Sequence, residues 1–133
     1  MIILKEETKI LALSKLFNYI KFECVDPDCL MFAASPIINQ IYDEIIEYIQ
    51  SEFPEKIKSV KSSNNIEDYS YHLLRTEQNI QRLTNWNNLT IDIKRVFILE
   101  LIHPYKINDK VINLIINNGD QFHKKDNNID EEK

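Results

Sequence analysis

The fold class is decided by the segment PIINQIYDEIIEYIQSE, residues 36–52. At 100° per residue its apolar side chains fall on one half of a helical wheel and its polar side chains on the other. The apolar half holds Ile38, Ile41, Tyr42, Ile45, Ile46 and Ile49, and the polar half holds Asn39, Gln40, Asp43, Glu44, Glu47 and Gln50. Ser35 and Pro36 form a typical helix start, because Ser caps the first turn and Pro fits its first position. The segment predicts an amphipathic helix.

The same periodicity recurs on both sides of this segment. It predicts helices over residues 6–22, 29–34, 66–84, 91–102 and about 109–117, with a short stretch at 54–61. Residues 91–102 are apolar nearly all round, which is typical of a central helix surrounded by others. Trp86, in an Asn-rich turn, is expected to be buried. These segments predict an all-α, single-domain bundle of five or six helices.

Composition excludes several alternatives. A chain of 133 residues fits one domain, and its single Gly and four Pro argue against tight hairpins, barrels and Gly-rich phosphate loops. No apolar run reaches the roughly 20 residues of a membrane span, and no secretory signal is visible. We therefore expect a cytoplasmic protein in which Cys24 and Cys29 are free thiols.

The predicted domain covers residues 1–119, and residues 120–133 are predicted to form a polar, flexible tail. Gly119, the only Gly, follows the last predicted helix, where a left-handed cap would end it. Beyond it only Phe122 and Ile129 are apolar, too few to dock the tail firmly.

Metal and catalytic motifs are weak. Zinc needs four ligands, usually as two close pairs, and Cys24 and Cys29 are the only cysteines. Glu100 and His103 have the Glu-x-x-His spacing of di-iron bundles, but the second copy that such bundles need is missing. No serine has a Gly-x-Ser-x-Gly setting. We predict no catalytic residue, no metal, no cofactor and no enzymatic activity.

The distribution of charge is the most informative feature. Residues 22–55 contain eight acids and no Lys or Arg, so this segment carries −8 while the whole chain carries −5 and the remainder +3. On the 36–52 helix, Asp43, Glu44 and Glu47 share the outer face, with Tyr48 at its border. Such a face either attracts a cationic partner or is simply solvated. The candidate partner-binding residues are Glu23, Asp26, Asp28, Asp43, Glu44, Glu47 and Tyr48.

The acidic set from Glu23 to Glu55, in a small chain predicted to be helical, resembles the bacterial immunity proteins of contact-dependent inhibition and related toxin-delivery systems. The resemblance implies that a carboxylate-rich face covers the active site of a basic toxin domain, in particular a nuclease, in place of its nucleic-acid substrate. It implies a protein partner, rather than nucleic acid or a membrane.

Two other functions stay open at this point. One is a small ligand-binding or regulatory domain, which would need polar groups to converge with His72 or His103. The other is a homo-oligomeric adaptor whose apolar surplus, for example around Ile98 and Leu101, forms a dimer seam.

Overall fold

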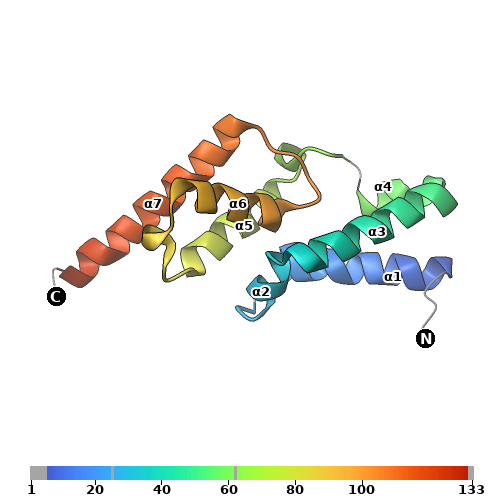
Figure 1. The fold of residues 1–133 in the computed structure, drawn as a ribbon, viewed down its shortest axis with the longest axis horizontal. Helices are drawn as coiled ribbons and strands as arrows, with labels where there is room; N and C mark the ends of the chain where they lie inside the picture. Colours follow the sequence, from blue (N-terminus) through green and yellow to red (C-terminus); the bar gives the residue numbers. More distant parts are fainter. Residues whose placement is uncertain (1–5, 25, 62, 132–133) are drawn as a thin grey trace.

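The chain folds into helices joined by short turns (Figure 1), in a computed structural model that describes residues 6–24, 26–61 and 63–131. The described α-helices are α1 (Glu7–Asn18), α2 (Cys29–Ala33), α3 (Pro36–Glu52), α4 (Ile57–Val60), α5 (Ser70–Arg82), α6 (Ile91–Ile102) and α7 (Asp109–Glu131). Shorter turns are η1, a π-helical turn (Tyr19–Glu23), and the 3₁₀ turns η2 (Pro54–Lys56), η3 (Ile66–Asp68) and η4 (Trp86–Asn88).

The all-α prediction is confirmed, because these residues contain no strand beyond one isolated bridge between Asn65 and Lys106. The described residues form seven α-helices in place of the predicted five or six, since the short stretch at 54–61 also contains one, α4. The predicted cap at Ser35 is present, because its hydroxyl accepts from the Ile38 amide, and at the start of α6 the hydroxyl of Thr90 likewise accepts from the Ile93 amide. In the described residues no helix is both long and apolar enough to cross a membrane.

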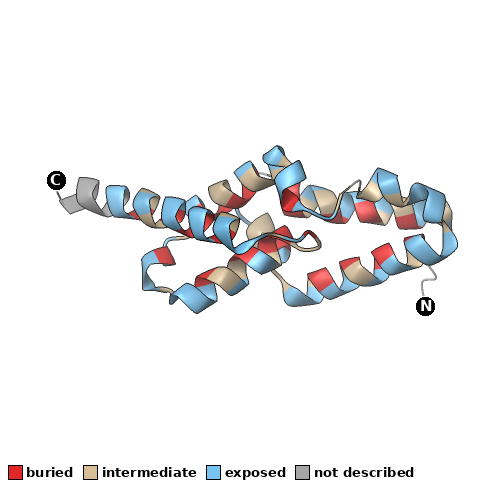
Figure 2. Ribbon diagram, turned by 90° about the horizontal axis from the view of Figure 1, so that it is seen from above, coloured by how far each residue is buried: buried red, intermediate tan, exposed pale blue. Residues whose placement is uncertain are grey.

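The first half of the molecule is built from α1, α3 and α4. α1 and α3 run side by side, and Figure 2 shows that their buried residues lie where the two helices face each other. The inward stripe of α1 consists of Ile10, Ser14 and Phe17 and is continued by Lys21 in η1, whereas Leu16 is 52% exposed. The core of this half consists of Ile10, Phe17, Tyr42, Ile45, Ile46 and Ile49.

The second half is built from α5, α6 and α7. Its core also includes Phe22 and Ala33, which come from η1 and α2 and so join the two halves. Trp86 is fully buried, as predicted, and its Nε1 donates to Asp120 Oδ1 at 2.8 Å. The turn around η4 is thereby attached to α7.

α6 is not the central, surrounded helix that its composition predicts. Ile98, Leu101 and Ile102 are buried, so the suggested seam around Ile98 and Leu101 is wrong. Ile93, Val96 and Leu99 are instead about half exposed on the opposite face. In the view of Figure 1, α6 crosses in front of α5 and no described helix covers it.

The last helix does not end near Asn117. α7 continues to Glu131, and Gly119 is helical rather than a left-handed cap. Gly119 is needed there for space, because a Cβ would lie 2.8 Å from Ile80 Cγ2 and 3.1 Å from Trp86 Cε2. Asp120 and His123 contact the bundle, so residues 120–123 are part of the packed structure and not of a polar tail.

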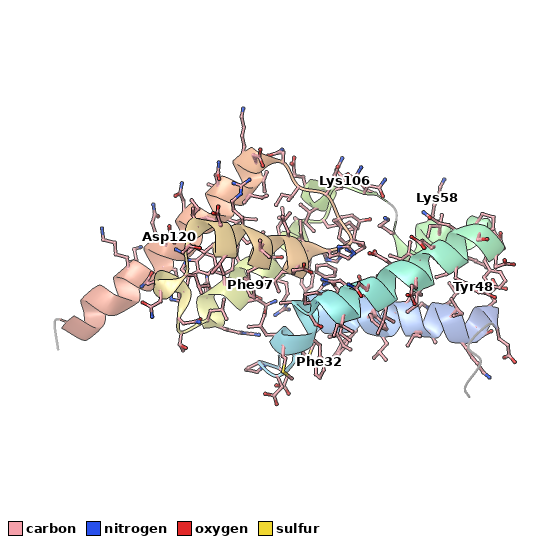
Figure 3. All side chains as sticks on the ribbon, in the orientation of Figure 1. Phe32, Tyr48, Lys58, Phe97, Lys106 and Asp120 are labelled. Atoms are coloured by element: carbon pink, nitrogen blue, oxygen red, sulfur yellow. A yellow bond between two sulfur atoms is a disulfide. The ribbon has the colours of Figure 1, made fainter. Side chains whose placement is uncertain are left out.

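The two cysteines are not free thiols. Cys24 and Cys29 form a disulfide that closes the turn between η1 and α2, contrary to the prediction for a reducing compartment. Figure 3 shows this disulfide and Phe32 at the same end of the α1–α3 hairpin.

Candidate functional site

The predicted acidic residues lie in two segments of the chain, one before α2 and one on α3. Glu23 is exposed at the end of η1, and Asp26 and Asp28 are exposed in the turn that the disulfide closes, where Asp26 Oδ1 accepts from the Asp28 amide at 2.9 Å. Glu44 and Glu47 are exposed on α3, two to three turns from its start. We call Glu23, Asp26, Asp28, Glu44 and Glu47 the acidic surface. Among the described residues, no Lys or Arg forms an ion pair with any of them.

Asp43 does not belong to this surface in the way that the helical wheel predicts. Its Oδ1 lies 2.7 Å from Nε2 of His103, and its side chain is 46% exposed. It therefore faces the end of α6 and joins α3 to the second half. The helical wheel placed Asp43 on the outer face of α3. In the structure α6 covers one edge of this polar face, and Asn39 is buried at the same edge.

Tyr48 is half-buried at the rim of the first core. Its ring lies 6.1 Å from that of Phe53 in an edge-on arrangement. Its position therefore combines packing with partial access to the exposed face of α3.

Exposed apolar side chains occupy the part of the chain between the two acidic groups. Met31 is 71% and Ile37 67% exposed, and Phe32 and Ile41 are also exposed. On α3, Ile37, Ile41 and Glu44 follow i, i+4, i+7 spacing, so apolar and acidic residues share one stripe. We call Met31, Phe32, Ile37 and Ile41 the α2–α3 apolar patch. Large exposed apolar groups rimmed by polar residues are typical of interaction sites.

A buried polar network lies beneath this region and was not predicted. The Lys21 ammonium donates to the Ala33 carbonyl at 2.6 Å, to Asn39 Oδ1 at 2.6 Å and to the Glu100 carbonyl at 3.0 Å. Asn39 in turn donates to the carbonyl and to Oε2 of Glu100, at 2.9 and 2.7 Å. The network ties η1, α2, α3 and α6 together and holds α2 against α3.

Burial governs the titration of Lys21, whose side chain is 2% exposed. Desolvation lowers its pKa from 10.5 to about 7, against the opposing attraction of the Glu100 and Asp43 carboxylates. The three acceptors match the three hydrogens of the charged form. The amine is enclosed by these partners, so the arrangement supports a structural role at the junction of the two halves.

His72 and His103 contact different side chains from other elements. His72 is stacked between Phe22 and Tyr69, with ring centroids 4.1 and 4.9 Å away, and burial lowers its pKa. His103 is engaged by Asp43. In the part of the chain that the structure describes, no three His, Cys, Asp or Glu side chains come together as metal ligands.

Comparison with known proteins places the chain in no family: no family model, no curated protein and no solved structure matches it.

Proposed function

We propose that this protein is a non-catalytic binding domain that takes a basic protein partner on the acidic surface and the α2–α3 apolar patch. The observation that carries the proposal is the coincidence of the two: four exposed apolar side chains lie in the one segment that has eight acids and no Lys or Arg. Apolar contact area provides affinity, whereas the carboxylates orient a cationic partner and speed its approach.

The alternative, that the acidic residues serve only solubility, does not account for the exposed apolar side chains beside them. A surface kept acidic only for solubility has no use for exposed Met31, Phe32 and Ile37 beside the carboxylates. An interface requires both, with an apolar centre and a charged rim.

More specifically, we propose that this binding domain is an immunity protein. Its partner would be a basic toxin domain, in particular a nuclease, whose phosphate-binding site is covered by carboxylates in place of the nucleic acid. This assignment is supported by the charge of the surface and by the resemblance described above. The cytoplasmic location stays a prediction, and the Cys24–Cys29 disulfide is evidence against it, because disulfides persist in oxidising compartments.

The test is a titration against the product of the adjacent gene, co-expressed and captured with this chain. Glu44→Lys with Glu47→Lys is expected to weaken binding at least tenfold at low salt, since the change removes attraction and adds repulsion. The matched control is Glu67→Lys with Glu77→Lys, which makes the same charge change outside residues 22–55. Both variants are first checked for helicity by circular dichroism. Equal losses in the two variants would show that net charge alone matters and would sink the proposed interface.

A second variant tests the contribution of the α2–α3 apolar patch to binding. Met31→Ser with Ile37→Ser leaves the charge unchanged and is expected to speed dissociation without changing the salt dependence of association. If this variant bound with wild-type affinity, the exposed apolar patch would have no part in the interface.

A further inference from the structure

The Cys24–Cys29 disulfide lies outside both hydrophobic cores. Both cysteines are half-buried, and the two cores are formed by other side chains. In Figure 3 the two bonded sulfur atoms lie at the edge of the molecule, beside Phe32. A disulfide in such a position is open to attack by a thiol while the protein stays folded, and its reduction exposes no core.

The disulfide holds one end of α2. This helix has only five residues, too few to be stable without tertiary contacts. At its C-terminal end Ala33 is buried, and the Ala33 carbonyl accepts from the Lys21 ammonium at 2.6 Å. At its N-terminal end Cys29 is bonded to Cys24, which directly follows η1. Leu30 adds a partly buried contact with the second core.

The turn between the two cysteines is otherwise held by local hydrogen bonds. The Cys29 amide donates to the Asp26 carbonyl at 3.0 Å, and the Leu30 amide donates to the Pro27 carbonyl at 3.1 Å. The Asp28 amide donates to Asp26 Oδ1 at 2.9 Å. These bonds lie within residues 26–30 and tie the turn to no other element. Reduction therefore removes the covalent attachment of the turn, while Lys21 still holds the far end of α2.

The attached segment carries part of the proposed partner surface. Asp26 and Asp28 belong to the acidic surface, and Met31 and Phe32 belong to the α2–α3 apolar patch. A surface that is already ordered binds without the entropic cost of ordering it, whereas a loosened segment must be ordered at the moment of binding. The state of the disulfide therefore affects affinity through the same side chains that contact the partner.

We propose that the Cys24–Cys29 disulfide is a redox switch of the partner surface: the oxidised chain holds residues 24–33 ready for a partner, and the reduced chain binds more weakly. This inference rests on the proposed function, because it concerns regulation of the same surface.

The reductant is a dithiol. One of its thiolates attacks a sulfur of the disulfide, which gives a mixed disulfide and releases the other cysteine as a thiolate. The second thiol of the reductant then displaces the remaining cysteine. Two electrons and two protons pass to Cys24 and Cys29, and the dithiol becomes a disulfide. Exchange with an oxidised dithiol reverses the reaction.

The first experiment needs no partner. The full chain is treated with dithiothreitol, and its thiols are titrated with and without urea; both are expected to appear without urea, since these are the only two cysteines. Amide hydrogen exchange is then compared between the oxidised and the reduced chain. Exchange at residues 26–33 is expected to speed up by roughly tenfold or more, with little change in α5, α6 and α7. Reoxidation is expected to restore the slow exchange.

Three results of this experiment would overturn the proposal. Thiols that appear only in urea would show that the folded protein shields the disulfide. Unchanged exchange at residues 26–33 would show that the disulfide does not order the segment. An equal increase in α5, α6 and α7 would show that the disulfide stabilises the whole fold and is no local switch.

The second experiment measures binding of the oxidised and the reduced chain to the product of the adjacent gene. Reduction is expected to weaken binding by roughly threefold or more. The matched control is Cys24→Ser with Cys29→Ser, checked for helicity by circular dichroism, which is expected to bind like the reduced chain and not to respond to dithiothreitol. Equal affinity of the oxidised and the reduced chain would overturn the switch and leave the proposed function standing. Binding by neither form would sink the proposed function instead, while hydrogen exchange would still decide whether the disulfide orders the segment.

Discussion

Lys21 and Asn39 are joined by a hydrogen bond of 2.6 Å at the point where the two halves of the molecule meet. Both side chains are 2% exposed, and both also contact the Glu100 backbone carbonyl on α6. A buried ammonium is costly unless it is fully hydrogen-bonded, and here three acceptors surround it. The position of α6 relative to α3 is therefore set by polar groups as well as by the apolar core.

The first prediction concerns the pH dependence of stability. The pKa of Lys21 is about 7 when folded and near 10.5 when unfolded, so the unfolded chain binds more protons between these values. The stability contributed at this site therefore rises with pH across that window, and below pH 7 the folded state bears the full cost of burying the charge. The slope from one proton is at most ~1.4 kcal/mol per pH unit.

Urea denaturation of wild type and Lys21→Met at several pH values between 6 and 9 checks this. The free energy of unfolding of the wild type, relative to the variant, is expected to increase above pH 7. Parallel pH profiles for the two proteins would show instead that the three acceptors keep the amine charged throughout.

The second prediction concerns Gly119. Replacing a Gly inside a helix by Ala normally stabilises it, by roughly 1 kcal/mol. Here the added Cβ would meet the side chains of Ile80 and Trp86, which are 1% and 0% exposed. We expect Gly119→Ala to destabilise the fold by about 1–3 kcal/mol, as overpacking does. The exposed Asn117→Ala is the control, and thermal unfolding followed by Trp86 fluorescence is the measurement; a Gly119→Ala variant as stable as this control would contradict the packing described.

Local sequence patterns predicted the helices well, but they predicted less well which side chains of each helix are buried by its neighbours. The bounds of α3 and α6 follow from Ser35-Pro36 and Thr90, whose caps are local signals. The stripe Ile10, Ser14, Phe17, Lys21 has the i, i+4, i+7, i+11 spacing of an inward face. From sequence alone, a Lys in that stripe is predicted to be exposed. Lys21 is buried because it is bonded to Asn39 and to the Glu100 carbonyl, which lie 18 and 79 residues away along the chain, where no local pattern points to them.

The same spacing was present in α7 at Ile112, Ile116, Gly119 and His123. It was hidden because a lone Gly is usually taken as a helix end, although here it makes room for a side chain from another helix. For α6 and for the polar edge of α3, no local pattern indicates which face a neighbour covers. The exposure of Val96 and the burial of Asn39 depend on that tertiary arrangement.

The third prediction concerns residues 120–133. A chain ending at Asp120 loses His123, which is 8% exposed and whose Nε2 lies 2.9 Å from the Ile80 carbonyl, and the half-buried Phe122. We expect a loss of about 2 kcal/mol and a melting temperature lower by several degrees. A chain ending at Lys125 keeps these contacts and is expected to melt close to the full-length protein. Equal melting temperatures for the two truncations would show that α7 contributes nothing after Asp120.

The fourth prediction concerns the disulfide. Linking residues five apart in sequence closes a short loop, for which the chain-entropy model gives roughly 2 kcal/mol. Cys24→Ser with Cys29→Ser, or treatment with a reductant, is expected to lower the free energy of unfolding by about this amount while the helical content stays unchanged. Thiol titration of the native protein as isolated measures how far the pair is oxidised. Two titratable thiols without reductant would contradict the disulfide and would favour a reducing compartment.

The last prediction separates the two kinds of acid on α3. Asp43 is bonded to His103 and lies near the buried Lys21, whereas Glu47 is exposed and forms no ion pair among the described residues. Asp43→Lys therefore removes an acceptor and adds a cation beside Lys21, and we expect it to destabilise the fold by more than about 1 kcal/mol. Glu47→Lys is expected to change the free energy of unfolding by no more than about 0.5 kcal/mol, as surface substitutions do. Urea denaturation of both variants at one pH provides the comparison. If Asp43→Lys were as harmless as Glu47→Lys, the contact with His103 would not hold α3 to α6, and Asp43 would return to the acidic surface as a residue free to meet a partner.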